Sequence, residues 1–260
     1  MRAIRNALLG LAVATTAGAL ENNSHADGIY NPPLTGNTQH DAWSSSSLTL
    51  AANPGFPGFP GTSPWPSSIQ SNSGGDAALD KIANGTSGGP YPAGESIYYG
   101  GFSGDFNNDG GTLAVSDATP VAGLANVVFQ IQIGEAWGYD FFNGILPVLS
   151  YNGGAQHLAA TYSTLTEQIQ TGTVVMPSGE EPIYKNSYLL QWDLTGIADP
   201  IQDFSIQFTG VQHAQLYALQ LDQSDVYTSL APQAAVPEPA SMSLLFCGVA
   251  ALIWRTRRSR

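Results

Sequence analysis

The strongest constraint on the fold is an alternation of apolar and polar side chains with a period of two. It is clearest in residues 126–134, where four apolar side chains share one face and two glutamines lie opposite. Residues 187–194 and 204–209 repeat the pattern. Successive side chains of a β-strand point to opposite faces, so the pattern predicts strands that bury one face and expose the other. The sheet that they form is expected to be packed on one side only.

Further strand candidates follow one another between turn residues, and no strong helix separates them. This succession predicts an all-β fold, an antiparallel β-sandwich or jelly roll. Trp192 is expected in its core, and residues 210–212 are expected to close a final hairpin. The candidates are residues 96–102, 112–116, 126–134, 145–151, 156–164, 172–176, 187–194, 204–209 and 214–222.

The segment before this series has a different composition. Residues 52–95 are rich in Pro, Gly and Ser, which favours loops. Only a candidate strand at 47–51 and a short helical turn at 76–82 stand out. We therefore expect an irregular N-terminal segment at 27–95, followed by a β-sandwich domain at 96–235.

The last 25 residues carry three parts in order. The apolar run predicts a short transmembrane helix of about 20 Å, against a hydrocarbon core of about 30 Å. The arginine side chains that follow can reach the interface and are expected on the cytoplasmic side. The parts are a motif at 236–241 that opens with Val236, Pro237, Glu238 and Pro239, the apolar run at 242–254, and a basic tail at 255–260 with Arg255, Arg257, Arg258 and Arg260.

This arrangement resembles the PEP-CTERM sorting signal of exported bacterial proteins. The resemblance implies processing near the Pro-Glu-Pro motif by an exosortase-type membrane transpeptidase. It also implies a bacterium with an outer membrane, often one that makes extracellular polysaccharide. The protein is therefore expected to be anchored in the inner membrane before processing, and then to reach the cell surface or the extracellular space.

The N-terminus is consistent with export. Arg2 and Arg5 precede an apolar stretch at 7–20, and Ser24-His25-Ala26 fits a cleavage site after Ala26. Residues 1–26 therefore predict a secretory signal peptide that is handled by Sec translocation and signal peptidase. The alternative is an N-terminal anchor that is not cleaved.

The exported part is strongly acidic. Residues 27–235 contain two basic side chains, Lys81 and Lys185, against 18 carboxylates, which gives a net charge of −16. Such a surface repels phosphate backbones, so we expect no nucleic-acid partner. The single cysteine, Cys247, lies in the apolar run, so no disulfide stabilises the exported part.

The stretch that begins at Asp105 matches the first half of a calcium-binding loop. Asp105, Asn107 and Asp109 place oxygen ligands at positions one, three and five, and Gly110 permits the sharp turn. Position twelve is Ser116 rather than glutamate, so the match is incomplete. The alternative is a turn rich in Asn and Asp between two strands. No other cofactor is expected.

Three tryptophans lie in or beside predicted loops. Exposed rings at such positions stack on sugar faces in carbohydrate-binding sandwiches, so Trp43, Trp65 and Trp137 are candidate sugar-binding residues. The alternative is that each ring covers a sheet edge or caps the core. Neighbouring polar and aromatic groups that would assist are Tyr139, Tyr151, Asn152 and Gln156.

Catalysis has weaker support in the sequence. A glycoside hydrolase needs two carboxylates about 5–10 Å apart across a cleft, and the candidates are Glu135, Asp140, Glu180 and Glu181. The histidines of the exported part, His40, His157 and His213, show no recognisable serine triad.

We therefore expect a non-catalytic protein with a structural or adhesive role at the cell surface or in the extracellular matrix. One alternative is a carbohydrate-binding module for extracellular polysaccharide, and another is a secreted glycoside hydrolase. Self-association would favour a structural matrix subunit.

Overall fold

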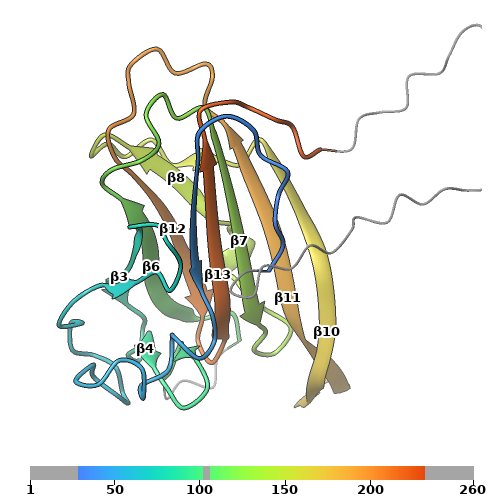
Figure 1. Cartoon of the computed structure of the whole chain (residues 1–260). Helices are drawn as coiled ribbons and strands as arrows, with labels where there is room; N and C mark the ends of the chain where they lie inside the picture. The colour runs from blue at the N-terminus through green and yellow to red at the C-terminus, as the bar shows by residue number, and fades with distance from the viewer. Residues whose placement is uncertain (1–28, 102–105, 232–260) are drawn as a thin grey trace, which may run out of the picture. The chain divides into compact units, whose positions relative to one another are not determined.

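The computed structural model describes residues 29–101 and 106–231. Within these residues, thirteen strands form a seven-stranded and a six-stranded antiparallel sheet that pack face to face (Figure 1). The prediction of an all-β sandwich is therefore confirmed. The predicted signal peptide, the sorting motif, the transmembrane segment and the basic tail lie outside the described residues. Among the residues that are described, no helix is long and apolar enough to cross a membrane.

The seven-stranded sheet contains most of the long strands. Its order is β10 (Tyr162–Met176), β11 (Gly179–Asp193), β7 (Asn126–Gly134), β13 (Gln215–Ser224), β5 (Ile97–Tyr98) and β4 (Tyr91–Pro92), and β1 (Thr38–Trp43) also pairs with β13. The six-stranded sheet has the order β2 (Ile69–Gln70), β3 (Ala78–Asn84), β6 (Asp109–Asp117), β12 (Phe204–Val211), β8 (Val148–Tyr151) and β9 (Leu158–Ala159). A short 3₁₀ helix, η1 (Phe142–Gly144), precedes β8.

The core lies between the two sheets. The alternating apolar side chains of β7 face those of β12, and Phe129 contacts Phe208 with ring centroids 5.8 Å apart. Trp192 is buried as predicted, and its indole Nε1 donates to the Leu158 carbonyl at 3.0 Å. Because one polar atom of this large ring is satisfied by backbone, its whole surface can be buried without an unpaired donor.

The outer face of β7 is covered, so the prediction that the sheet packs on one side only is wrong for this strand. Gln130 is buried, and its Nε2 donates to the Tyr30 carbonyl at 2.6 Å. Gln220 of β13 donates to the same carbonyl, and its Oε1 accepts from the Ile29 amide at 2.7 Å. The N-terminal segment therefore lies over the sheet, where glutamines satisfy its backbone (Figure 1).

The boundary expected at residue 95 does not separate two parts of the chain. β1 pairs with β13 and β3 pairs with β6, although both β1 and β3 precede that boundary. Residues 76–82, expected as a helical turn, lie largely in β3, and residues 47–51, expected as a strand, form turns. The compact unit that contains both sheets ends at Thr228.

The final hairpin was predicted incorrectly. β12 belongs to the six-stranded sheet and β13 to the seven-stranded sheet, so residues 212–214 cross between the sheets. The long hairpin is instead β10–β11, since β10 begins within the candidate at 156–164 and contains the whole candidate at 172–176. β11 pairs with β7 only from Lys185 onward, so the tip of this hairpin is held by its two strands alone.

Candidate functional site

One end of the sandwich carries aromatic side chains from separate loops. Trp137 follows β7, and its ring packs edge-on against His213 and Phe106, with centroids 4.9 and 5.6 Å apart. Tyr98 of β5 also contacts His213, with its Oη 2.7 Å from Nδ1. Phe106, Tyr98, His213 and Trp137 are here named the Trp137 cluster. Sequence reasoning pointed to Trp137 but missed its partners, because only the tertiary fold brings their loops together.

The loops that carry this cluster share an unusual backbone conformation. The backbone φ is +51° at Trp137, +71° at His213, +49° at Asn107 and +56° at Asn143. Asparagine adopts this conformation readily, but for a bulky residue it costs about 1–3 kcal/mol. The Asn143 amide donates to Asn107 Oδ1 at 3.0 Å and so fixes two of the loops against each other. Such strain is common at binding sites, where surrounding contacts hold it in place.

Part of the cluster is accessible to ligands. Phe106 is 44% exposed, the Trp137 side chain is half-buried, and Tyr139 from the same loop is 42% exposed. Rings held at fixed angles beside a histidine and a phenolic hydroxyl offer both a stacking surface and hydrogen-bonding groups. The arrangement is therefore suited to holding a sugar ring.

Two of the predicted hydrolase carboxylates meet in the loop that carries Trp137. The Asn186 side-chain amide donates to Glu135 Oε1 at 2.8 Å and to Asp140 Oδ2 at 3.0 Å. Tyr188 Oη donates to the same Asp140 oxygen at 2.6 Å, and burial together with this hydrogen bond raises the pKa of Tyr188. Since β11 supplies Asn186 and Tyr188, the network ties this loop to the neighbouring strand.

The other two carboxylates lie elsewhere. Glu180 and Glu181 are exposed near the turn of the β10–β11 hairpin, where Thr173 donates to Glu180 at 2.5 Å and Ser178 donates to Glu181. The structure therefore brings together Glu135 and Asp140 but leaves the glutamates of the hairpin apart.

Only one of the three predicted sugar-binding tryptophans belongs to the Trp137 cluster. Trp43 is fully buried and its Nε1 donates to the Ile69 carbonyl, so its prediction as an exposed sugar-binding ring is wrong. Trp65 is partly buried, packs edge-on against Phe56 at 5.4 Å and donates to the Pro90 carbonyl. Its ring therefore covers the core, which was the alternative interpretation.

The polar groups expected to assist sugar binding lie at the opposite end of β12, apart from Tyr139. Tyr151 pairs with Phe204 at the start of this strand, whereas His213 follows its end at Val211. Eight extended residues span about 25 Å. Gln156 bonds to the Tyr151 backbone and Asn152 to that of residues 200–202, so both close local turns.

The calcium pattern is only partly described, because Asp105 lies outside the described residues. Asn107 Oδ1 accepts from Asn143, and Asp109 Oδ1 accepts from the Gly111 amide at 2.8 Å. Asp109 is already the first residue of β6, so position twelve, Ser116, lies about 20 Å further along an extended strand. The remainder of a twelve-residue loop therefore does not wrap around these ligands, and calcium binding stays a prediction.

Residues 85–89 match the Gly-x-Ser-x-Gly pattern of a nucleophile elbow. The expectation that the chain has no serine triad did not take this match into account. In such an elbow the serine lies between a strand and a helix. Here Ser87 lies in a turn between β3 and β4, and no helix follows among the described residues. The geometry therefore gives this serine no nucleophile position.

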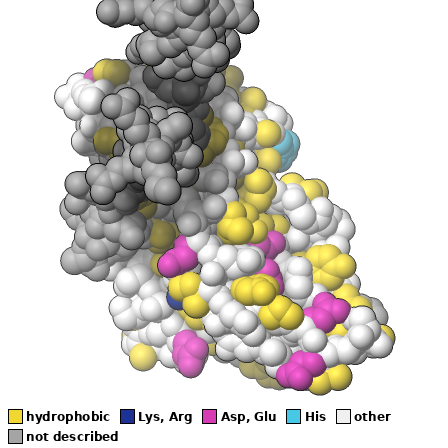
Figure 2. Space-filling view, turned by 90° about the vertical axis from the view of Figure 1, so that its right-hand side faces the viewer, with side chains coloured by type: hydrophobic (Ala, Val, Ile, Leu, Met, Phe, Trp, Pro, Cys, Tyr) yellow, Lys and Arg dark blue, Asp and Glu magenta, His cyan; other side chains and the backbone are white. Residues whose placement is uncertain are grey.

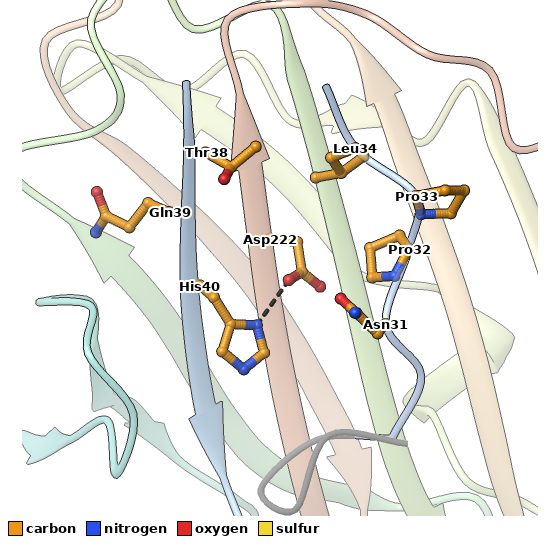
Figure 3. A pocket seen from close by; sticks show the side chains of 8 residues that line it. All are labelled: Asn31, Pro32, Pro33, Leu34, Thr38, Gln39, His40 and Asp222. Carbon is orange, nitrogen blue, oxygen red and sulfur yellow. Dashed lines mark hydrogen bonds and ion pairs between the residues drawn. The ribbon is translucent and has the colours of Figure 1, made fainter. Parts of the chain in front are cut away.

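A pocket of about 320 Å³ lies between the N-terminal segment and β1 (Figure 3). His40 Nδ1 lies 2.7 Å from Asp222 Oδ1 at its base, an arrangement that resembles the base and orienting acid of a triad. The lining residues include no serine that could act as the nucleophile of a triad. Their only hydroxyl belongs to Thr38, two positions before His40 on the same strand. The lining residues are Asn31, Pro32, Pro33, Leu34, Thr38, Gln39, His40 and Asp222.

Three carboxylates converge on one amide at the end of β1. Gln39 Nε2 donates to Asp76 at 2.6 Å, to Asp117 at 3.2 Å and to Asp41 at 3.4 Å. Burial and a neighbouring carboxylate raise the pKa of both Asp41 and Asp117. No group of His, Cys, Asp and Glu side chains within residues 29–101 and 106–231 is arranged to hold a metal. The junction therefore connects β1 with β6 through hydrogen bonds.

The two sheets define an all-β sandwich. Comparison with known protein families indicates how the protein is sorted in the cell. A family model described as the PEP-CTERM protein-sorting motif matches residues 235–258. The chain therefore carries a PEP-CTERM sorting motif, which implies export and membrane anchoring before processing, and motifs of this kind are recognised by exosortases. No curated protein and no solved structure matches the chain.

Proposed function

We propose that this protein is a non-catalytic adhesive component of the cell surface or extracellular matrix, and that its sandwich binds extracellular polysaccharide through the Trp137 cluster. The observation that carries the proposal is the fixed aromatic group itself. Trp137 is held between Phe106 and His213, in a loop whose strained backbone places the ring at the end of the sandwich. A large ring of this kind buries more area on a sugar face than any other side chain.

The charge of the exported part supports a neutral polysaccharide as the ligand. Glu135 and Asp140 lie in the same loop as Trp137, and they would repel uronic acids. Neither lysine of the exported part is in the cluster. Lys81 Nζ donates to carbonyls of Gly61 and Ser63, and Lys185 lies over the Tyr217 ring at 5.5 Å.

Binding can be tested with two matched tryptophan substitutions. Trp137→Ala is expected to weaken the affinity for a neutral polysaccharide by about 5- to 150-fold, since a stacked ring contributes on the order of 1–3 kcal/mol. Trp65→Ala removes a ring of the same type that is held against Phe56, and it is expected to leave the affinity unchanged. Affinity electrophoresis across neutral and acidic glycans measures both. Loss of binding in both variants, or in neither, would contradict the proposal.

The sorting step has its own test, which is the intact mass of the protein from each cell fraction. Cleavage after Ala26 and a new C-terminus near residues 237–240 are expected in the surface or extracellular fraction. A mass that runs through Arg260 in the membrane fraction would instead indicate a permanently anchored periplasmic protein.

A glycoside hydrolase is the second candidate, because Glu135 and Asp140 accept from the same amide. Their remaining contacts favour a structural role. Asp140 Oδ1 accepts from the Phe141 amide at 2.7 Å, and Glu135 Oε2 accepts from the Tyr184 amide at 3.1 Å. A reducing-end assay on the glycans that bind is expected to show no hydrolysis. Release of reducing ends that Asp140→Asn abolishes would establish the hydrolase.

A further inference from the structure

The edges of the two sheets differ sharply in length. Among the described residues, three edges end on strands of two residues each, β4, β2 and β9. β4 also contains Pro92, which cannot donate to a further strand. The outer side of β1 is covered, since Ser71, Asn72 and Ser73 bond to its backbone. Short strands, proline and covering loops are among the means by which proteins prevent edge-to-edge pairing, together with charged side chains and bulges.

The edge at β10 lacks most of these protections. β10 has fifteen residues, and within the described part of the chain β11 is the only strand that pairs with it. It contains no proline and no lysine, and Glu167 is its only charged residue. Leu165, Ile169 and Val175 are exposed large hydrophobic side chains, and Val175 is 83% exposed. Figure 2 shows this side of the molecule, where hydrophobic and carboxylate side chains are interspersed with uncharged polar ones.

Two bulges interrupt the pairing of β10 with β11. The register with β11 shifts between Leu165 and Glu167, and again between Gln170 and Gly172. The extra residues are both threonines, and their Oγ1 atoms donate back to β11, Thr166 to the Ser187 carbonyl at 2.9 Å and Thr171 to the Ile183 carbonyl at 3.4 Å. The threonine hydroxyls therefore bond toward β11, and no other described strand pairs with the outer side of β10.

We infer that β10 is the surface through which two copies of this chain pair, edge to edge and antiparallel. Two copies with a net charge of −16 in their exported parts repel each other over most of their surfaces. β10 carries one carboxylate in fifteen residues, and the exposed Glu180 and Glu181 of β11 lie beside its last residues only, so the rest of the strand is where like-charged copies can approach. An antiparallel strand is also its own complement under a two-fold axis.

The size of this edge sets the strength of the association. Fifteen extended residues span about 50 Å, and with a layer about 10 Å thick the pair would bury roughly 1,000 Å² in total. That area is at the lower limit for a specific interface, so the dimer is weak and depends on concentration. Anchoring by the sorting signal concentrates the copies at the membrane and favours pairing there.

The test is sedimentation velocity of the purified full-length protein in detergent, over a range of concentrations. The variant Ile169→Glu/Val175→Glu adds charge to the edge, and it is expected to weaken dimerisation at least tenfold. The matched control, Ile145→Glu/Ile82→Glu, adds the same charge at side chains that are 61% and 52% exposed away from β10. It is expected to dimerise like the unmodified chain. A strictly monomeric protein, or equal weakening by both variants, would overturn the inference.

Hydrogen exchange at low and high protein concentration locates the contact without assuming a register. The amides of residues 162–176 are expected to exchange more slowly at high concentration. Protection that appears elsewhere and leaves β10 unchanged would also overturn the inference. Pairing needs neither a glycan nor the Trp137 cluster, so its failure would leave the polysaccharide proposal intact, and the reverse also holds.

Discussion

The interior between the sheets and the loops at the Trp137 end use the same residue type for opposite purposes. Trp192 is buried between the sheets, and its only polar atom is satisfied by the Leu158 carbonyl. Trp137 is half-buried, touches other rings by their edges and has a positive φ. The first position stabilises the fold, whereas the second requires the fold to hold a strained loop in place. Burial and backbone conformation together, rather than residue type, therefore separate a structural tryptophan from one that is available for binding.

The largest expected effect is the replacement of the buried ring. Trp192→Ala is expected to lower the free energy of unfolding by about 3–5 kcal/mol, because it removes a large buried side chain and leaves a cavity. Trp137→Ala is expected to cost about 1 kcal/mol or less, since part of the ring is exposed and less apolar area is removed from water. Denaturant unfolding of both variants measures the difference. Equal losses of unfolding free energy in the two variants would show that the interior and the Trp137 end do not differ in this way.

The sequence anticipated the interior far better than the loop end. Residues 126–134 were predicted with the bounds of β7, because alternation within one strand is a local signal. β3 was missed, since Ala78–Asn84 has no such alternation and becomes a strand only by pairing with β6. The Trp137 cluster joins four separate stretches of chain, so no local pattern could reveal it. The pocket over His40 depends in the same way on residues 31–34 crossing the sheet.

The outer face of the seven-stranded sheet offers an intermediate case. Asp222 is buried there and accepts from His40 Nδ1 and Gln220 Nε2, both at 2.7 Å. Asp222→Ala is expected to cost about 2–3 kcal/mol, because buried donors lose a charged acceptor. Asp225→Ala is the control, since its donors from Asn37 are exposed and water can replace the carboxylate. A similar loss in both variants would contradict the importance of burial.

A pair of tyrosines extends the comparison to hydroxyl groups. Tyr99 is fully buried and its Oη has no partner among the described residues, so Tyr99→Phe is expected to stabilise the protein by about 1 kcal/mol. Tyr188→Phe removes the hydrogen bond to Asp140 and is expected to destabilise it by about 1.5 kcal/mol. Thermal unfolding gives the sign of each change. Destabilisation by Tyr99→Phe would mean that its hydroxyl has a stabilising contact.

The carboxylates that accept hydrogen bonds from Gln39 predict that the free energy of unfolding depends on pH. The folded-state pKa of Asp41 and Asp117 is raised above the ordinary value of 3.8, chiefly by burial. The folded state therefore binds more protons than the unfolded chain, and stability is lost as the pH rises through the raised values. Relative to the unmodified protein, Asp41→Asn/Asp117→Asn is expected to gain stability as the pH rises above 3.8.

The control for this dependence is Asp199→Asn, which replaces an exposed carboxylate. The change in relative stability with pH is expected to be larger for the double variant than for this control. Urea unfolding at several pH values measures both differences. If the stability of the double variant relative to the unmodified protein falls as the pH rises, the raised pKa values of Asp41 and Asp117 are contradicted.

The most direct measurement of the central claim is fluorine NMR of protein labelled with 5-fluorotryptophan. The chain has five tryptophans, and single substitutions assign their resonances. On titration with a neutral polysaccharide, the resonance of Trp137 is expected to shift, while those of Trp43, Trp65 and Trp192 stay in place. A Trp137 resonance that does not move with any glycan, or a shift confined to Trp65, would contradict the account.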